Sequence, residues 1–392
     1  MLNLGVGTET IIDGRVYIQT REGVNGHAIY GPYERLEPGD YVVEFTIAPV
    51  GNEAFSEDFI CAWLDVAIDN GQGTVADDMV RTSQITSGES ALRLAFMLNA
   101  PATVEYRVHV SGIVPLRIAD GPVVSRGKQG IEPWPRPAFM IDQRHIARGM
   151  YFEGGKVAVV DDHVVATLNG IRFHARNYDD VNFVRELFVL NAYNVLSARP
   201  TCVIDIGMNV GLASLQFAAK DFVKEVHAFE PFRATYERGL ANIALNPELA
   251  RKIIANNVGL GDIDGDILMN IHDTGDSGAM QTRNSDQGIP MTVPMREASG
   301  ALRPIVAAAR ERGLAVAVKV DCEGSEFPVF ASLADHGLLP KIDSFMVEWH
   351  RIFPDSSQHT LIAPLLDNGY TVFDLSQPTG NGFFYAVRTA RP

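Results

Sequence analysis

The sequence predicts two domains of different fold class: an all-β sandwich, followed by an α/β domain with a doubly wound, mostly parallel sheet. Three observations carry this prediction. Short segments of alternating polar and apolar residues fill residues 1–120, separated by Gly, Pro, Asn and Asp. From about residue 179, apolar strands alternate with helical segments, which is typical of a sheet covered by helices on both faces. A proline-rich segment separates the two patterns.

Length, composition and charge limit the classes of protein. At 392 residues the chain is long for one domain, and its 46% hydrophobic and 21% charged residues are ordinary for globular proteins. The net charge of −15 argues against nucleic acid or an anionic membrane as the main partner. We see neither an apolar run of the ~18 residues that span a membrane nor a secretory signal. Three separated cysteines without zinc-site spacing are expected to be buried thiols in a reducing cytoplasm.

The first domain is expected to be a β-sandwich over residues 1–120. Its clearest strands show period-two alternation and lie at residues 15–18, 41–47, 91–96 and 104–110. Several short strands with turn residues between them favour two packed sheets. Tyr30, Tyr33 and Trp63 are candidate platforms for sugar rings, although core packing is the better interpretation of each.

A linker and bridging segment are expected over residues 121–150, before a second domain over residues 151–392. The linker is semi-rigid where prolines crowd, at positions 133, 135 and 137. Residues 140–151 are predicted to form a short amphipathic helix, and residues 156–174 two or three small strands.

The second domain begins with a predicted helix over residues 181–198, which leads into a strand that ends at Asp205. Further strands are expected at residues 225–229, 253–258, 315–320, 344–349, 371–375 and 382–387. Further helices are expected at residues 233–245, 301–312, 325–336 and 359–368. Residues 262–296 are a polar stretch with no predicted element.

A turn of the pattern D-x-G-x-N-x-G follows the strand that ends at Asp205. Gly207 and Gly211 allow a tight turn and a close ligand, and Asn209 is the non-glycine residue type that best tolerates positive φ. The spacing differs from the nicotinamide fingerprint, whose glycines fall at +2 and +5. A glycine-rich turn without a ligand is the competing interpretation.

Polar residues follow the next two strands at the same predicted sheet edge. Glu230 ends the second strand, where nucleotide-binding α/β sheets place an acid that accepts hydrogen bonds from ribose hydroxyls. Ligands of open α/β sheets lie at the carboxyl ends of the strands. Residues 257–260 at the end of the third strand, with Asn257 and Val258 first, are therefore expected to flank the adenine of such a ligand.

Acidic residues crowd the ends of the fourth and fifth strands. Asp321 and Glu323 are expected to be functional, since a buried strand rarely ends in clustered acids without a ligand. Glu326 is either part of this site or a first-turn acid that favours the helix dipole. Glu348 and His350 follow at the fifth strand, and histidine is the natural general base near neutral pH, although a lone histidine is more often structural.

Together these segments resemble the FkbM-type methyltransferases that use S-adenosylmethionine (SAM). The family's motifs stand here in order as DIGMNVG (205–211), EP (230–231), GLGDIDG (259–265), KVDCEGSE (319–326) and VEWH (347–350). The resemblance implies a seven-stranded methyltransferase sheet, SAM as the cofactor and O-methyl transfer to a hydroxyl. By position it implies cofactor contacts for Asp205, Gly207, Asn209, Gly211 and Glu230. It likewise implies acceptor-site roles for Asp321, Glu323, Glu326 and Glu348.

The first domain is similar to jelly-roll modules attached to bacterial sugar-modifying enzymes, through G-P-Y (31–33) and L-x-P-G-x-Y (36–41). The expected function is therefore SAM-dependent O-methylation of a sugar on a polysaccharide or glycolipid. Asp321, Glu348 and His350 are the catalytic candidates. Magnesium-assisted transfer is possible with these acids, and we place it second to metal-free transfer.

Two rival functions stay open at the level of the sequence. In the first, the chain is a methyltransferase whose acceptor is an amine or a polyketide hydroxyl. In the second, the chain is a glycan-binding protein with an inactive methyltransferase-like scaffold. The intact turn at residues 205–211 and Glu230 argue against the inactive scaffold. The oligomeric state is not indicated.

Overall fold

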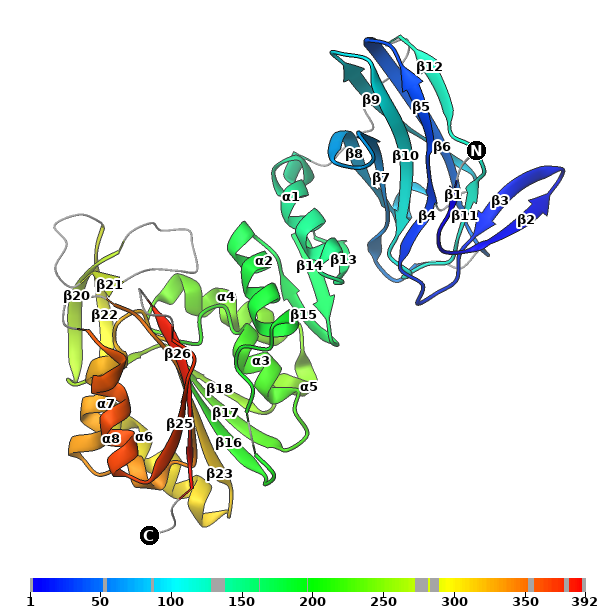
Figure 1. Cartoon of the computed structure of the whole chain (residues 1–392). Helices are drawn as coiled ribbons and strands as arrows, with labels where there is room; N and C mark the ends of the chain where they lie inside the picture. The colour runs from blue at the N-terminus through cyan, green and yellow to red at the C-terminus, as the bar shows by residue number, and fades with distance from the viewer. Residues whose placement is uncertain are drawn as a thin grey trace. The chain divides into compact units, whose positions relative to one another are not determined.

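The chain folds into two compact units in a computed structural model (Figure 1). The model describes residues 3–51, 55–85, 88–127, 138–161, 163–195, 197–271, 281–282, 289–351, 356–376 and 381–389. The first unit comprises Met1–Leu168 with His174–Tyr178, and the second comprises Asn169–Phe173 with Asp179–Pro392. The division falls later in the chain than the expected boundary at residue 150. Prolines 133, 135 and 137 of the predicted linker lie outside the described residues.

Antiparallel strands dominate the first unit. Its elements are β1 (Asn3–Leu4), β2 (Thr8–Ile12), β3 (Arg15–Gln19), β4 (Gly26–Tyr30), β5 (Pro32–Leu36), β6 (Gly39–Pro49), β7 (Asp58–Ile68), β8 (Gly73–Arg81), η1 (Thr82–Gln84), β9 (Ser90–Leu98), β10 (Ala102–Val110), β11 (Leu116–Ala119), β12 (Val123–Arg126), α1 (Ala138–Phe152), β13 (Lys156–Val160) and β14 (His163–Leu168). One sheet runs β1-β4-β10-β7-β13-β14, with β5 on β10 and β8 on β7. The other runs β12-β6-β11-β3-β2, with β9 on β6.

The two sheets of this unit share one hydrophobic core. Leu64 and Tyr106 from the first sheet and Phe45 and Leu94 from the second belong to the same buried cluster. The alternation predicted from the sequence is visible in β9, where every second side chain is buried. Trp63 is 1% exposed and lies against the rings of α1, so the packing interpretation is correct for this residue.

The second unit alternates strands and helices. Its elements are β15 (Ile171–His174), α2 (Tyr178–Val184), η2 (Arg185–Val189), β16 (Thr201–Ile206), α3 (Leu212–Ala218), β17 (Val223–Phe229), α4 (Arg233–Ala244), α5 (Pro247–Ala250), β18 (Ile253–Asn256), β19 (Gly259–Gly261), β20 (Gly265–Ile271), β21 (Gln281–Thr282), β22 (Ile289–Glu297), α6 (Ala298–Glu311), β23 (Ala315–Val320), α7 (Glu326–Asp335), η3 (Leu339–Lys341), β24 (Ser344–Trp349), α8 (Gln358–Asp367), β25 (Tyr370–Asp374) and β26 (Gly382–Arg388). β15 begins in this unit and ends in the first.

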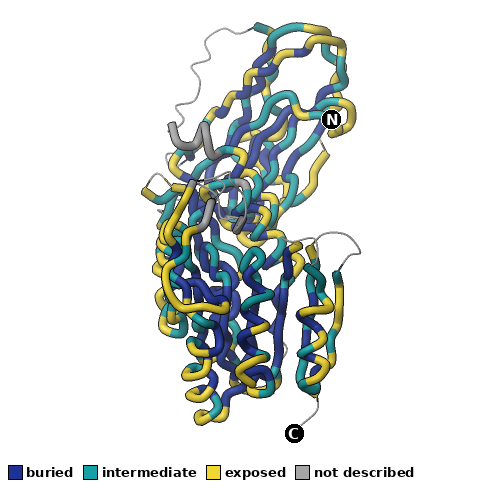
Figure 2. The backbone as a smooth tube through the Cα atoms, turned by 90° about the vertical axis from the view of Figure 1, so that its left-hand side faces the viewer, coloured by how far each residue is buried: buried dark blue, intermediate teal, exposed yellow. Residues whose placement is uncertain are grey.

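A seven-stranded sheet with the order β18-β17-β16-β23-β24-β26-β25 forms the centre of the second unit. Neighbours from β18 to β24 are parallel, whereas β26 is antiparallel to both β24 and β25. α6, α7 and α8 pack on one face, with α3, α4 and α5 on the opposite side (Figure 1). The central strands β16 and β23 are buried along their whole length (Figure 2).

Two regions of the second unit differ from the sequence-based expectation. The helix predicted over residues 181–198 ends early, as α2 and the π-helical turn η2, because Asn191 has a φ of 53° that a helix does not accommodate. The polar stretch 262–296 contains β20, β21 and β22, which form a separate four-stranded sheet with β19. Val293 and Met295 are buried there, although their neighbours are exposed or half-buried.

Within the part of the chain that the structure describes, no helix is long and apolar enough to cross a membrane.

Candidate active site

A cavity of about 430 Å³ opens at the carboxyl ends of β16, β17, β23 and β24. This is where open α/β sheets bind ligands. It is lined by Asp179, Asn182, Phe183, Glu186, Ile206, Gly207, Asn209, Phe229, Glu230, Pro231, Phe232, Thr235, Gly259, Leu260, Met295, Asp321, Cys322, Glu323, Ser325 and Glu348. Among these described residues, many are acidic and none is basic.

The turn after β16 forms one wall of the cavity. Gly207, Asn209 and Gly211 have φ values of 84°, 52° and 82°, in the left-handed region that glycine and asparagine tolerate. A Cβ atom on Gly207 would lie 1.7 Å from the carbonyl oxygen of Asp321, so no larger residue fits. The amides of Gly207 and Met208 donate to the Phe229 carbonyl at 3.0 and 2.9 Å. This wall is therefore built from backbone, and it brings the ends of three strands together.

Glu230 reaches the cavity from the end of β17 and is 5% exposed. One carboxylate oxygen accepts a hydrogen bond from the Asn209 amide at 3.0 Å, and the other accepts from the Phe232 amide at 3.0 Å. Burial raises the pKa of Glu230 to about 7, against the lowering effect of these two amides. A carboxylate has further lone pairs, so Glu230 is held in place while still able to accept from a ligand.

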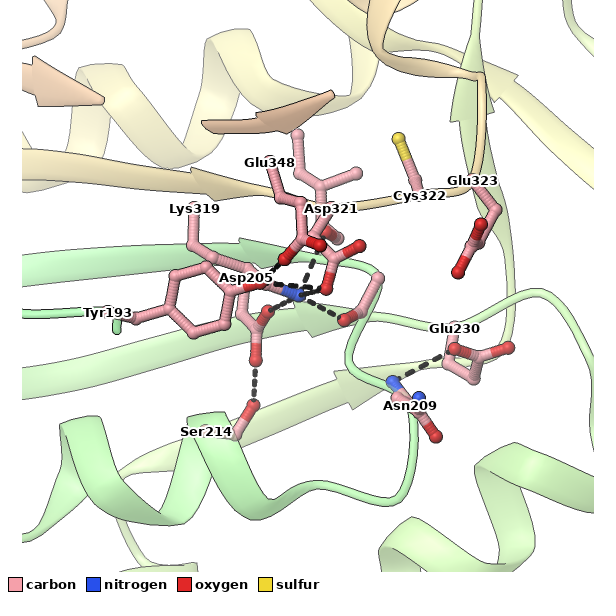
Figure 3. Close-up of polar contacts among 12 residues, drawn as sticks. Tyr193, Asp205, Asn209, Ser214, Glu230, Lys319, Asp321, Cys322, Glu323 and Glu348 are labelled. Atoms are coloured by element: carbon pink, nitrogen blue, oxygen red, sulfur yellow. Dashed lines mark hydrogen bonds and ion pairs between the residues drawn. The ribbon is translucent and has the colours of Figure 1, made fainter. Parts of the chain in front are cut away.

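Lys319 is a buried ammonium group at the centre of the site, 2% exposed on β23 (Figure 3). Its Nζ lies 3.3 Å from Asp205 Oδ1 and 3.3 Å from Asp321 Oδ2, and it donates to the Gly207 carbonyl. Burial lowers the pKa of Lys319, but the two carboxylates outweigh burial and raise it overall. Lys319 therefore connects the cofactor turn to the acids after β23.

Asp205 lies beneath the turn and does not line the cavity. Its side chain is completely buried, and Oδ2 accepts a hydrogen bond of 2.5 Å from the Ser214 hydroxyl. Burial raises the pKa of Asp205, whereas the Lys319 charge lowers it. The structure thus gives Asp205 a supporting position, and direct contact with a cofactor stays a prediction.

Asp321 and Glu348 meet across the hydroxyl of Tyr193, a residue that no sequence pattern singles out (Figure 3). Tyr193 Oη lies 3.0 Å from Asp321 Oδ2 and 2.6 Å from Glu348 Oε2. The ring of Tyr193 is buried, with its centroid 5.3 Å from Lys319 Nζ. No helical or strand periodicity marks Tyr193, because it lies in an irregular segment after η2.

The loop after β23 is held by Glu326. This fully buried carboxylate accepts hydrogen bonds from the amides of Cys322 at 3.1 Å and Gly324 at 2.8 Å. Its Oε1 also lies 3.0 Å from His350 Nδ1. Glu326 does not line the cavity, so its predicted contact with an acceptor has no support here and its position is structural.

His350 is buried among carboxylates and does not fit the predicted role of general base. Its Nε2 lies 3.5 Å from Glu323 and 3.8 Å from Glu348, with Glu326 on the other ring nitrogen. Burial lowers the pKa of His350, but the hydrogen bond to Glu326 and the charge of Glu323 raise it to about 9 overall. Three carboxyl groups around the ring favour its charged form, which has no free lone pair for a proton. His350 does not line the cavity, and its role as a general base stays a prediction without support from this position.

Glu186, on η2, is a second lining residue that the sequence did not reveal. Burial, followed by the charges of Glu348 and Asp321, raises the pKa of Glu186 to about 7. Burial likewise raises the pKa of Glu323 to about 7, and it raises that of Glu348. The cavity thus holds more carboxyl groups than its buried cations balance.

Gly211 and Asn257, both predicted to contact the cofactor, lie near the cavity without lining it. Gly211 begins α3, where a Cβ atom would meet the Gly239 carbonyl oxygen at 3.3 Å. The Asn257 amide group donates to the carbonyls of Glu230 and Pro231 at 2.9 and 3.1 Å. Asn257 thus fixes the chain beside Glu230.

Val258 also lies outside the lining of the cavity. It is partly buried against the core formed with α6, α7 and α8. Gly259 and Leu260, the other two residues of the predicted range 257–260, line the cavity.

A ribose-bearing cofactor fits the residues of the cavity. The volume of the cavity lies within the ~300–1,000 Å³ typical of ligand pockets. Glu230 offers a buried carboxylate to two hydroxyls, and Leu260 and Met295 supply apolar walls for a flat base. The absence of a side chain at Gly207 lets the turn after β16 pack directly against the Asp321 backbone at the edge of the cavity.

A resident metal ion fits less well. Asp321, Glu323 and His350 each offer an atom within 4.8 Å of the others. A hard cation such as Mg²⁺ prefers oxygen ligands to an imidazole, and the Lys319 ammonium already lies 3.3 Å from Asp321. We therefore assign no metal to this group.

Comparison with known proteins gives one family match. Residues 205–372 match the family model described as Methyltransferase FkbM domain. The search of curated proteins found no match.

Solved structures give only distant likenesses. A methyltransferase FkbM from Methylobacillus flagellatus KT is 15% identical, with 52% of this chain and 47% of that chain covered and a TM-score of 0.33. Sp1610 from Streptococcus pneumoniae, a putative tRNA (m1A22) methyltransferase in complex with SAM, is 11% identical. The match covers 50% of this chain and 69% of that chain, with a TM-score of 0.30. TrmK of M. capricolum, in complex with S-adenosylhomocysteine, is 10% identical. The match covers 51% of this chain and 68% of that chain, with a TM-score of 0.30. Such low values say nothing about the acceptor.

Proposed function

We propose that this chain, which carries an FkbM methyltransferase domain over residues 205–372, is a SAM-dependent O-methyltransferase that acts on a hydroxyl of a saccharide. The observation that carries the proposal is the convergence of two sets of groups on one cavity. The glycine turn and Glu230 form one side, and Asp321, Glu323 and Glu348 form the other. A methyl donor and an acceptor have to meet at such a junction.

The cofactor side holds SAM through its backbone and Glu230. The carboxylate of Glu230 would accept hydrogen bonds from the ribose, and Gly207 and Asn209 would bring the backbone close to the amino-acid end. Leu260 and Met295, which also line the cavity, would flank the adenine. Asp205 acts from below, because its pairing with Lys319 and Ser214 fixes the turn.

The acceptor side removes one proton. Bound SAM supplies a methyl group on a good sulfonium leaving group. Asp321 lines the cavity and takes the proton of the acceptor hydroxyl as that oxygen gains the methyl group. Lys319 places a positive charge 3.3 Å from the Asp321 carboxylate. A positioned base of this kind contributes roughly 10²–10⁴-fold to rate.

A saccharide suits the remaining lining groups. Carboxylates accept hydrogen bonds from neighbouring hydroxyls, and Glu186, Glu323 and Glu348 offer several such acceptors around Asp321. An amine is the second candidate acceptor, because an ammonium group would also be attracted by this excess of carboxyl groups. The three free thiols of the chain suit a reducing compartment, so we place the reaction in the cytoplasm.

Transfer of a labelled methyl group from SAM to a panel of acceptors tests the proposal. We expect label on neutral oligosaccharides, with little on amines of similar size. Asp321→Ala should abolish transfer while leaving SAM binding largely intact. Asp374→Ala, at an exposed edge position of β25, is the matched control and should behave as wild type. Wild-type turnover by Asp321→Ala would refute the assignment, and label only on amines would favour the second candidate.

Two further experiments address the acceptor and the metal. Mass spectrometry of surface glycans from cells with and without the gene should show the loss of a single methyl group. Dialysis against EDTA, followed by assays with and without added Mg²⁺, should leave the rate unchanged. A rate restored only by Mg²⁺ would instead show a cation at the acids after β23.

A further inference from the structure

The hydroxyl of Tyr193 lies between two carboxyl groups of the proposed acceptor side. Its Oη is 3.0 Å from Asp321 Oδ2 and 2.6 Å from Glu348 Oε2, both within hydrogen-bonding distance. Tyr193 comes from the segment after η2, Asp321 from the end of β23 and Glu348 from β24. Three separate parts of the chain thus meet at one oxygen atom.

The number of protons at this junction is limited. A phenol has a single hydrogen and can donate it to only one of the two carboxyl groups. The other contact is favourable only if that carboxyl group carries a proton and donates it to the phenol oxygen. Two ionised carboxylates on either side of Tyr193 would leave one of these close oxygen pairs without a hydrogen. The arrangement therefore favours one ionised and one protonated carboxyl group.

Lys319 decides which of the two is ionised. Its ammonium lies 3.3 Å from the same Asp321 Oδ2 that contacts Tyr193, whereas no ion pair between Lys319 and Glu348 is found among the described residues. The ammonium thus places its positive charge beside Asp321 rather than beside Glu348. Glu348 then carries the shared proton, and its Oε2 lies 2.6 Å from the phenol oxygen, within hydrogen-bonding distance.

Other charged groups face this junction and act on both carboxyls. Glu186 on η2 adds negative charge, which disfavours two ionised groups together. His350 Nε2 lies 3.8 Å from the other oxygen of Glu348, Oε1. That contact is longer than the Lys319 contact and is shared with Glu323, so it opposes protonation of Glu348 only weakly.

We propose that Tyr193 is a positioning residue that keeps Glu348 protonated and directs the ionised Asp321 to act as the only base of the pair. The proton arrangement is inferred from contacts within the free protein. Its consequence for catalysis rests on the proposed methyl transfer. Both contacts of Asp321 use Oδ2, so Oδ1 is left to take the proton from an acceptor. Tyr193 thereby aligns the carboxylate, without touching the acceptor.

Matched amide variants test the assignment in the reaction. Glu348→Gln replaces a protonated carboxyl group by a neutral group of the same shape that still donates, so kcat should fall by less than about tenfold. Asp321→Asn removes the base, so kcat should fall by roughly 10³-fold. The opposite order, with Glu348→Gln the more damaging, would overturn the proposal.

Tyr193→Phe tests the hydroxyl itself. It keeps the ring that packs on Phe383 and under Lys319, but Asp321 loses the hydroxyl that holds its Oδ2. We expect kcat to fall by about tenfold or more, with the KM for the acceptor and the affinity for SAM changed less than about threefold. Tyr370→Phe is the control, since it removes another buried hydroxyl, which donates to backbone carbonyls away from the cavity. An unchanged kcat in Tyr193→Phe would contradict the proposal.

Carboxyl ¹³C NMR of the free protein decides the proton arrangement even if no methyl transfer is found. Glu348 is identified by the signal missing in Glu348→Gln. We expect Glu348 to be protonated at neutral pH in the wild type. An ionised Glu348 at neutral pH refutes the inference. A protonated Glu348 in a protein that does not bind SAM refutes the proposed function instead.

Discussion

The cofactor side of the cavity is made largely of backbone, whereas the acceptor side is made of side chains from separate segments. Gly207, Asn209 and the amides that hold Glu230 belong to one continuous turn and the strand beside it. Tyr193, Asp321 and Glu348 come from positions far apart in the sequence. The cofactor side requires particular backbone conformations, and therefore residue types that adopt them. The acceptor side requires a balance of charges, and therefore depends on which of its side chains are protonated.

Two substitutions should have the largest effects, and the first is a side chain at Gly207. Gly207→Ala places a Cβ atom 1.7 Å from the Asp321 carbonyl oxygen at a φ of 84°, so the wall has to open. We expect SAM binding to be lost and the unfolding free energy to fall by about 3 kcal/mol or more. Calorimetry with SAM and denaturant unfolding measure the two effects.

Gly313→Ala is the matched control for this prediction. Gly313 also has a positive φ, of 73°, but nothing lies within 4 Å of its added Cβ. It should cost only about 1 kcal/mol and leave SAM binding intact. Equal effects of the two substitutions would show that strain alone, rather than the close approach, explains the turn.

Lys319 connects both sides, so its removal should damage both. Lys319→Met keeps most of the volume but leaves Asp205 and Asp321 without their cation. A loss of about 3–5 kcal/mol is expected from unpairing buried charges, together with loss of SAM binding and transfer. The exposed Lys224→Met is the control. If only transfer were lost, the two sides would be independent.

The strands and the turn that carry the two sides of the cavity could be predicted from the sequence. The strands that end at Asp205, Glu230, Asp321 and Glu348 show as apolar runs, and the turn shows through its glycines. Their convergence follows from the parallel sheet.

The side chains that complete the acceptor side could not be predicted in the same way. Tyr193 and Glu186 lie where a predicted helix breaks, and neither carries a periodic signal. The surroundings of His350 could not be predicted either, because the fold brings Glu326 to its ring. Such pairings depend on tertiary contacts that one sequence does not contain.

A smaller effect concerns pH and Glu230. Its pKa is raised by burial to about 7 in the folded state, above the ordinary value of 4.5, so the folded state binds more protons between these pH values. Its contribution to the unfolding free energy therefore falls as pH rises from about 4.5 to about 7, by on the order of 1–3 kcal/mol. Glu230→Gln should flatten the pH dependence of stability, measured by denaturant unfolding. The exposed Glu237→Gln should leave it unchanged, and an equal slope in both variants would contradict the burial argument.

The smallest effect is expected beneath the turn. Ser214→Ala removes the 2.5 Å hydrogen bond to Asp205, while the ion pair with Lys319 remains. Stability should fall by about 1–3 kcal/mol, and the affinity for SAM by less than about tenfold. Thermal unfolding and calorimetry measure these changes, with Ser125→Ala, at an exposed position of β12, as control. An undiminished stability would mean that the turn does not depend on this bond to Asp205.

Calorimetric titration with SAM of the wild type, Glu230→Gln and Asp321→Asn separates the two sides of the cavity. We expect the wild type to bind SAM, Glu230→Gln to bind at least about tenfold more weakly, and Asp321→Asn to bind within about threefold of the wild type. Absence of binding by the wild type would contradict the proposed cofactor. Weaker binding by Asp321→Asn than by Glu230→Gln would contradict the division into a cofactor side and an acceptor side.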